Sequence, residues 1–228
     1  MKRLFFILFL SGTLLANGQK DKMRPRNEVN TDPSLVRFMA KLNHIIDTKN
    51  TKALLAVMDT DIKVSFGEYW GHEGFIEMWK PNNPKSGVWK LLPTLINMGG
   101  VWESPPDDSL FVFPYATTAE ADSVDPDWVM VITDTNVNMR EKPDKNAKVI
   151  TRLSYNMVTE GNDPLDNSHP EIAHLQFVGR NKWNYVSTLD RKYAGYVYYT
   201  YIWSVIDYRL YLQKEKGKWS IRYFLDGD

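Results

Sequence analysis

The chain has 228 residues, and its 28 basic side chains balance 28 acidic ones. A balanced charge gives no general attraction to nucleic acid or to an anionic membrane, so we expect no nucleic-acid partner. The sequence contains no cysteine, which excludes thiol nucleophiles, thiolate metal sites and disulfides. The length allows one large domain or two small ones.

Residues 1–18 have the features of a signal peptide. Two basic residues precede an uncharged apolar run over residues 4–10, and Ala16 and Gly18 fit a small-x-small cleavage site. A membrane anchor is the alternative, but the run is shorter than the roughly 20 apolar residues that a bilayer core requires. We therefore predict a secreted or periplasmic protein with no membrane span in the mature chain, and a polar linker over residues 19–30.

Residues 31–120 combine helical and strand patterns, which predicts an α+β domain. Asp32 is a suitable N-cap residue, and Pro33 suits the first position of the helix that follows. The helix that follows should bury one apolar face, made of Leu35, Phe38, Met39, Leu42, Ile45 and Ile46.

Further elements of this region follow from the same signals. Short helices are expected over 52–58 and 73–80, and a third between a Ser86 cap and Gly99, which Pro93 should kink or divide. The alternation in DIKVSF predicts a strand with Ile62, Val64 and Phe66 facing inward, and LFVF predicts another that stops at Pro114.

The acidic segment 119–127 lacks an apolar face and is the best domain boundary. Beyond it, apolar runs separated by turn residues predict strands over 128–133, 136–140, 148–153, 157–160, 183–188 and 195–199. A long loop should occupy 161–174. The last part, 206–228, predicts a β-hairpin with strands at 208–214 and 218–225.

Five short motifs occur in order within this β-rich region. They are NVNMR at 136–140, KVI with Leu153 at 148–153, WNYV at 183–186, GYV at 195–197 and Tyr201-Ile202. In this order they make residues 128–204 resemble the bacterial SH3 domain family. The resemblance implies a small closed β-barrel that binds peptide or cell-wall glycopeptide and has no catalysis of its own. The sequence departs from the family in the long loop before Trp183 and in Glu141-Lys142-Pro143, which replaces the usual Gly-Pro turn.

The two ends of the remaining chain carry a weaker resemblance. DIKVSFGEYWG at 61–71 and GKWSIRYFLDGD at 217–228 look like the ends of NTF2-like α+β domains. This implies that 206–228 completes the N-terminal domain and that the barrel is inserted within it.

Aromatic residues between Trp183 and Trp203 are the leading candidates for a binding surface. The candidate ligand-binding residues are Tyr185, Tyr196, Tyr198 and Tyr201. Rigid rings with hydroxyl groups suit the binding of peptides or sugars. Alternation could place Tyr196, Tyr198 and Trp203 outward with Val197 and Tyr199 inward, or the reverse. The rings could instead fill the barrel and its contact with the other domain, which we expect for Trp183 and for about half of the tyrosines on the period-two argument.

No group of residues supports catalysis or metal binding equally well. Glu73 and Glu77 share a helix face, which is more typical of a solvated surface than of an acid–base pair. His169, Glu171 and His174 have ligand chemistry for zinc, but Pro170 argues against a helical arrangement. Neither a GxSxG elbow nor a glycine-rich phosphate loop occurs. We therefore predict no catalytic residue, no metal and no cofactor.

These observations favour a secreted, non-enzymatic binding protein. Its SH3-like module would recognise peptide, peptidoglycan or another envelope protein. Two alternatives remain from the sequence. The N-terminal domain could be an envelope hydrolase or a small-ligand pocket that the module targets, or the chain could be a protein–protein interaction scaffold.

Overall fold

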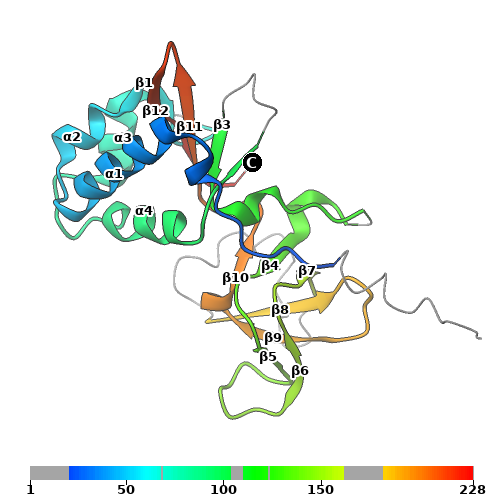
Figure 1. Ribbon diagram of the computed structural model, residues 1–228. Helices are drawn as coiled ribbons and strands as arrows, with labels where there is room; N and C mark the ends of the chain where they lie inside the picture. The colour runs from blue at the N-terminus through cyan, green and yellow to red at the C-terminus, as the bar shows by residue number, and fades with distance from the viewer. Residues whose placement is uncertain (1–20, 68, 104–109, 123, 162–181, 228) are drawn as a thin grey trace, which may run out of the picture.

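The computed structural model describes residues 21–67, 69–103, 110–122, 124–161 and 182–227. The predicted signal peptide, the loop at 162–174 and its histidines lie outside the described residues. The described part of the chain contains helices and two β-sheets (Figure 1). The predicted α+β class is confirmed.

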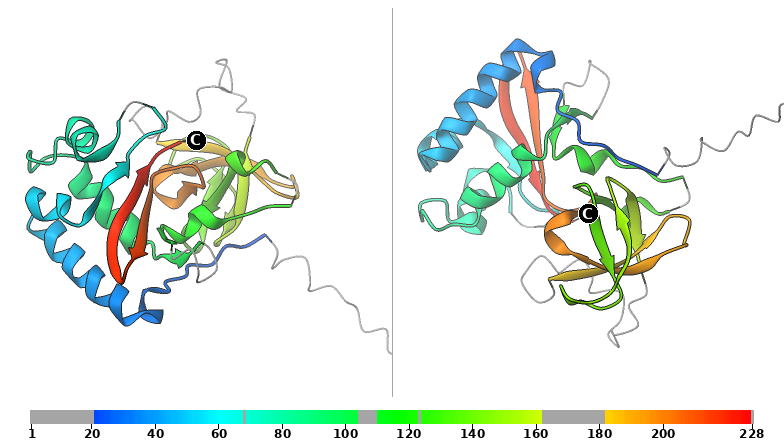
Figure 2. Two further views of the ribbon diagram at one scale, coloured as in Figure 1. Left: turned by 90° about the horizontal axis from the view of Figure 1, so that it is seen from above. Right: turned by 60° about the horizontal axis from the view of Figure 1, so that its bottom comes forward.

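The α-helices lie against one face of the first sheet (Figures 1 and 2). They are α1 (Pro33–Asp47), α2 (Thr51–Leu55), α3 (Gly71–Trp79) and α4 (Val88–Asn97). Ring contacts join this layer to strand β12 (Lys218–Leu225). Phe38 of α1 lies 6.5 Å from Trp219 and Phe75 of α3 lies 6.3 Å from Phe224, measured between ring centroids.

Helix α1 begins as the sequence predicts. The Asp32 side chain accepts hydrogen bonds from the backbone N–H groups of Ser34, at 2.6 Å, and Leu35, at 3.3 Å, which satisfies donors that a helix start leaves free. The buried residues of α1 are the predicted apolar face: Leu35, Phe38, Met39, Leu42, Ile45 and Ile46.

Several predicted boundaries in this region are wrong. Met58 opens strand β1 (Met58–Lys63) instead of ending a helix. Because β1 ends at Lys63, Phe66 falls in the following turn and is 51% exposed, whereas Ile62 and Val64 are fully buried. The N-cap of α4 is Gly87, one residue after the predicted Ser86, although the Ser86 hydroxyl accepts from the Val88 N–H at 3.4 Å. Helix α4 is not divided and runs unbroken through Pro93.

The first sheet has the strand order β1-β12-β11-β3-β2. Its remaining strands are β2 (Val101–Trp102), β3 (Leu110–Phe113) and β11 (Arg209–Glu215). β1 pairs with β12 in parallel and the other neighbours pair antiparallel. The C-terminal hairpin β11–β12 thus occupies the middle of a sheet whose other strands precede residue 114.

The second sheet has the order β10-β4-β7-β8-β9-β5-β6. Its strands are β4 (Val129–Ile132), β5 (Val137–Arg140), β6 (Val149–Leu153), β7 (Met157–Glu160), β8 (Trp183–Thr188), β9 (Ala194–Tyr198) and β10 (Ile202–Ser204). At Gly195 a side chain would meet the Arg140 carbonyl at 2.6 Å, so glycine lets β9 approach β5. Among the described strands, β10 and β6 are the two ends of the sheet and no pairing joins them, so the closed barrel is not confirmed.

The two sheets meet at a shared apolar core. Val129, Val131, Met157 and Trp203 of the second sheet belong to the same buried cluster as the helices and the first sheet. The segment before α1 also joins them, as the right-hand view of Figure 2 shows. The Asp21 backbone carbonyl accepts from the Met157 N–H at 2.8 Å, and the Glu28 N–H donates to the Gly100 carbonyl at 2.8 Å.

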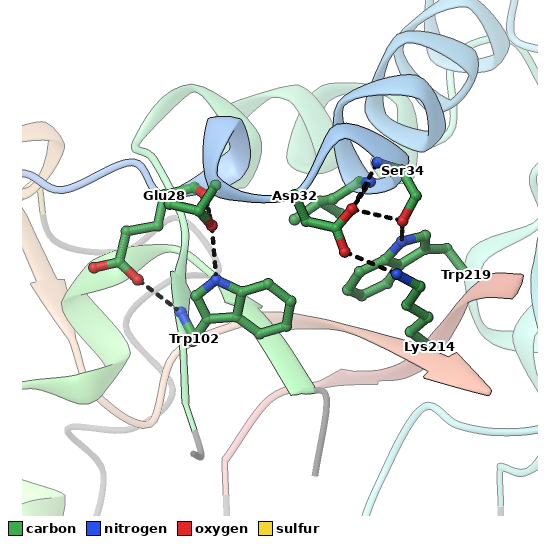
Figure 3. Close-up of polar contacts among 8 residues, drawn as sticks. Glu28, Asp32, Ser34, Trp102, Lys214 and Trp219 are labelled. Carbon is green, nitrogen blue, oxygen red and sulfur yellow. Dashed lines mark hydrogen bonds and ion pairs between the residues drawn. The ribbon is translucent and has the colours of Figure 1, made fainter. Parts of the chain in front are cut away.

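A polar network fixes the start of α1 on the first sheet (Figure 3). Lys214 of β11 donates to Asp32 at 2.9 Å, and the Trp219 indole N–H donates to the Ser34 hydroxyl at 2.9 Å. The Ser34 hydroxyl in turn donates to Asp32 at 2.7 Å. These hydrogen bonds, first from Ser34 and then from Lys214, hold the pKa of Asp32 well below its usual range.

Candidate functional site

A row of aromatic rings lies on one face of the β8–β9 ladder. Trp183 is directly opposite Tyr198, and Tyr185 is directly opposite Tyr196. Residues two apart in a strand share a face, and opposed residues share it across the ladder. The four rings therefore lie on the same side of the second sheet.

The row continues past the end of β9 into the short 3-10 helix η5 (Tyr199–Tyr201). Tyr198 contacts three rings, with centroid distances of 5.2 Å to Trp183, 5.0 Å to Tyr199 and 6.5 Å to Tyr201. Tyr199 is 40% exposed and Tyr201 is 41% exposed. We call Trp183, Tyr198, Tyr199 and Tyr201 the aromatic strip.

The opposite face of the ladder carries the core of the second sheet. Val186 and Val197 alternate with the rings and are fully buried. The described residues of this core are Ile132, Val137, Met139, Leu153, Val158, Val186, Val197 and Ile202. None of these is aromatic, and the partly buried ring that packs against them is Tyr193, which is not part of the strip. The rings of the strip are therefore not what fills this core.

The structure separates the predicted binding residues into two pairs. Tyr198 and Tyr201 lie together in the aromatic strip. Tyr185 packs against Tyr196 with centroids 4.9 Å apart, and Tyr196 is only 2% exposed. A ligand at the surface therefore reaches Tyr201 readily and Tyr196 hardly at all.

The structure matches neither of the two expected alternations throughout. Val197 is fully buried, as in the first, whereas Tyr199 is exposed and Trp203 is 5% exposed in the shared core, as in the reverse. The cause is that β9 ends at Tyr198 and η5 interrupts the alternation before β10 begins. Trp183, expected inside the barrel, instead contacts Tyr198 on the face opposite the core.

A second candidate region, which the sequence did not indicate, is a cleft beside strand β1. Asp61, Lys63, Trp70, Gly71, Arg222 and Tyr223 line it. Trp70 is 50% exposed. No local signal could have identified this cleft, because Arg222 and Tyr223 come from the far end of the chain and reach β1 only through the parallel pairing of β1 with β12.

A third group of polar residues lies near the C-terminal end, at Asp207, Tyr208, Arg209 and Asp226. Burial raises the pKa of Asp207 to about 7, against the opposing effect of a 2.9 Å hydrogen bond from the Ser204 N–H. Burial also raises the pKa of Asp226, and that of Tyr208 to about 12. The Arg209 guanidinium donates to the Val205 carbonyl at 3.3 Å and to the Gly227 carbonyl. These bonds tie the terminal segment to the start of β11.

Of the remaining chemical candidates, Glu73 and Glu77 lie in α3, whereas His169, Glu171 and His174 fall outside the described residues. Within the described ranges, no cluster of three or more histidine, aspartate or glutamate side chains is arranged to hold a metal ion. The helices of the same ranges include none with both the length and the apolarity needed to cross a bilayer.

Comparison with known proteins gives no relative, since no protein-family model, curated protein or solved structure matches this chain.

Proposed function

We propose that this protein is a secreted, non-enzymatic binding protein of the bacterial cell envelope. Its second sheet acts as an SH3-like module that holds peptide or cell-wall glycopeptide on the aromatic strip. Two observations support the proposal. They are the resemblance of the motifs in residues 128–204 to the bacterial SH3 family and the arrangement of rings on β8, β9 and η5.

The single observation that carries the proposal is the separation of rings from core in the second sheet. The buried cluster that is confined to the second sheet contains no aromatic residue among the described positions, although Tyr193 packs against it and Trp203 is buried in the shared core. Tyr199 and Tyr201 keep about two-fifths of their surface exposed. Exposing large rings next to each other gives a patch that water solvates poorly and that a ligand can cover. Tyrosine and tryptophan supply such contact area with little loss of conformational entropy.

Ring packing within the strip adds to this argument. Tyr198 touches Trp183 on the neighbouring strand and both tyrosines of η5. These contacts limit the rotamers of the rings before a ligand arrives, which lowers the entropic cost of binding. A rigid row of hydroxyl-bearing rings suits an extended ligand such as a stem peptide or a glycopeptide strand.

The test is co-sedimentation of the full-length protein with purified peptidoglycan sacculi, together with titration of a soluble stem peptide. The double variant Tyr199→Ala/Tyr201→Ala should lose most of the sedimented fraction and bind the peptide roughly tenfold more weakly or worse. Phe66→Ala is the matched control, because Phe66 is also an exposed ring but lies in the other region of the chain.

Three results would contradict the proposal. One is equal retention of the double variant and the unmodified protein. Another is an absence of binding to both sacculi and stem peptide. The third is release of soluble fragments from sacculi by the purified protein, which would make it a hydrolase.

A further inference from the structure

The cleft beside β1 has the size of a small-molecule site. Its volume is about 630 Å³, within the roughly 300–1,000 Å³ typical of ligand pockets. Strand β1 forms one wall, the start of α3 another, and Arg222 and Tyr223 of β12 complete it. It belongs to the first sheet and is separate from the aromatic strip.

Trp70 is held in place at this cleft although half of its surface is exposed. Its indole N–H donates to the Gly67 carbonyl at 2.7 Å, and its backbone forms an antiparallel bridge with Lys63. Gly71 follows with φ +65°, and a side chain there would meet the Thr60 carbonyl at 3.0 Å. The turn therefore requires glycine, and it fixes the indole against β1 without burying it.

The polar groups of the cleft are also fixed in place. The Lys63 ammonium lies 4.8 Å from the centroid of the Trp70 ring. Arg222 forms an ion pair of 2.8 Å with Asp59, and its guanidinium lies 5.6 Å from the Tyr223 ring. Asp61 adds a carboxylate to the lining.

The charges of these groups indicate the class of ligand. The cations Lys63 and Arg222 are matched by the carboxylates Asp59 and Asp61, so the site has no excess positive charge with which to select a phosphate or another strong anion. What it offers is a flat apolar ring surrounded by alternating hydrogen-bond donors and acceptors. A sugar ring matches that combination, because its C–H face packs on an indole and its hydroxyls both donate and accept.

We propose that the cleft lined by Asp61, Lys63, Trp70 and Arg222 binds a neutral saccharide, with one sugar ring stacked on Trp70. Asp61 accepts from its hydroxyls, while Lys63 and Arg222 donate to them. The site goes beyond the proposed function of the aromatic strip and does not depend on it.

The experiment is isothermal titration of the full-length protein with two neutral probes, tetra-N-acetylchitotetraose and cellotetraose, followed by saturation-transfer NMR on any probe that binds. We expect at least one probe to bind, with its sugar-ring protons close to the protein. Trp70→Ala should weaken binding roughly tenfold or more, and Asp61→Ala by a smaller factor. Trp70→Phe should restore part of the affinity, because it keeps a ring at the same position.

Controls separate this site from the aromatic strip and from loss of folding. Phe66→Ala removes an exposed ring of the same loop that does not line the cleft, so it should bind the probe as the unmodified protein does. Tyr199→Ala/Tyr201→Ala should also keep full saccharide affinity, whatever it does to sacculus binding. Thermal unfolding followed by circular dichroism checks that each variant is folded.

The proposal is overturned if neither neutral probe binds, or if a folded Trp70→Ala variant binds as well as the unmodified protein. It is also overturned if only an anionic probe, such as an oligogalacturonate, binds at the cleft.

Discussion

The two sheets of this protein use aromatic residues in opposite ways. In the first sheet and its helices, rings fill the interior, and Phe75, Phe111, Phe113 and Phe224 are fully buried. In the second sheet, Trp183, Tyr185, Tyr196 and Tyr198 lie on the face opposite its own buried cluster, which contains no aromatic residue among the described positions. Trp203 of this sheet is buried instead in the core shared with the first. Aromatic content alone therefore does not reveal a binding surface. What matters is whether the surrounding core needs those rings.

Removing a buried ring from the first sheet should have the largest effect on stability. The ring centroid of Phe224 lies 5.0 Å from that of Trp79, 5.9 Å from that of Tyr208 and 6.3 Å from that of Phe75. Phe224→Ala should lower the free energy of unfolding by about 3–5 kcal/mol through lost burial and a residual cavity. Denaturant unfolding measures this change, with Phe224→Leu as a milder control. A loss below about 1 kcal/mol would show that the ring is not part of a tightly packed core.

The polar network at the start of α1 should have the next largest effect. Asp32→Ala removes the helix cap and leaves Lys214 without its partner, so we expect a loss of about 1–2 kcal/mol. Lys214→Met should cost less than about 1 kcal/mol, because the cap remains and a partly exposed ion pair contributes little. The two variants are compared in the same denaturant titration. An equal loss in both would mean that the ion pair, not the cap, holds this end of the helix.

The buried carboxyl of Asp207 predicts a pH dependence of stability. In the folded protein its pKa is about 7, whereas in the unfolded chain an aspartate ionises near pH 4. The folded state therefore holds more protons between these values, and the free energy of unfolding should fall as pH rises from about 4 to 7 and stay lower above that. We expect a contribution on the order of 1–3 kcal/mol.

Asp207→Asn isolates this contribution, since the amide keeps the shape of the side chain and does not titrate. Melting temperatures of the variant should fall less between pH 5 and pH 8 than those of the unmodified protein. Burial also raises the pKa of Glu160 to about 7, so part of the slope should persist. An unchanged slope in the variant would contradict the assignment to Asp207.

The aromatic strip should give the smallest change in stability. Tyr199→Ala and Tyr201→Ala each remove an exposed ring that fills no core, so each should alter the free energy of unfolding by no more than about 0.5 kcal/mol. A loss close to that of Phe224→Ala would mean that the rings of the strip stabilise the fold. The two sheets would then not differ in how they use aromatic residues.

Local patterns were sufficient to predict most strands. The bounds of β7, β8 and β12 are those expected, because alternation and turn residues delimit them within a few positions. Strands β2 and β10, of two and three residues, were missed because so short a run carries no period. The end of β1 was misplaced because DIKVSF keeps alternating past Lys63, where the chain already turns.

The candidate sites were predictable to the extent that they are local. The ring-rich stretch from Trp183 to Tyr201 is contiguous apart from one turn, so its tyrosines could be named. Their directions could not, because η5 interrupts the alternation after Tyr198. The cleft at Trp70 could not be anticipated, since it depends on a parallel pairing between strands at opposite ends of the chain. Pairings of that kind leave no signal in either segment.

The central place of β11 and β12 in the first sheet has a consequence for synthesis on the ribosome. Strands β1 and β3 emerge early, yet their hydrogen-bonding partners are made only after every described strand of the second sheet. Until β11 and β12 are made, the helices have no complete sheet to pack on. The described strands of the second sheet, in contrast, have already been synthesised by then. Deletion of residues 209–225, which form β11 and β12, would therefore destabilise the helices and the first sheet more than the second sheet.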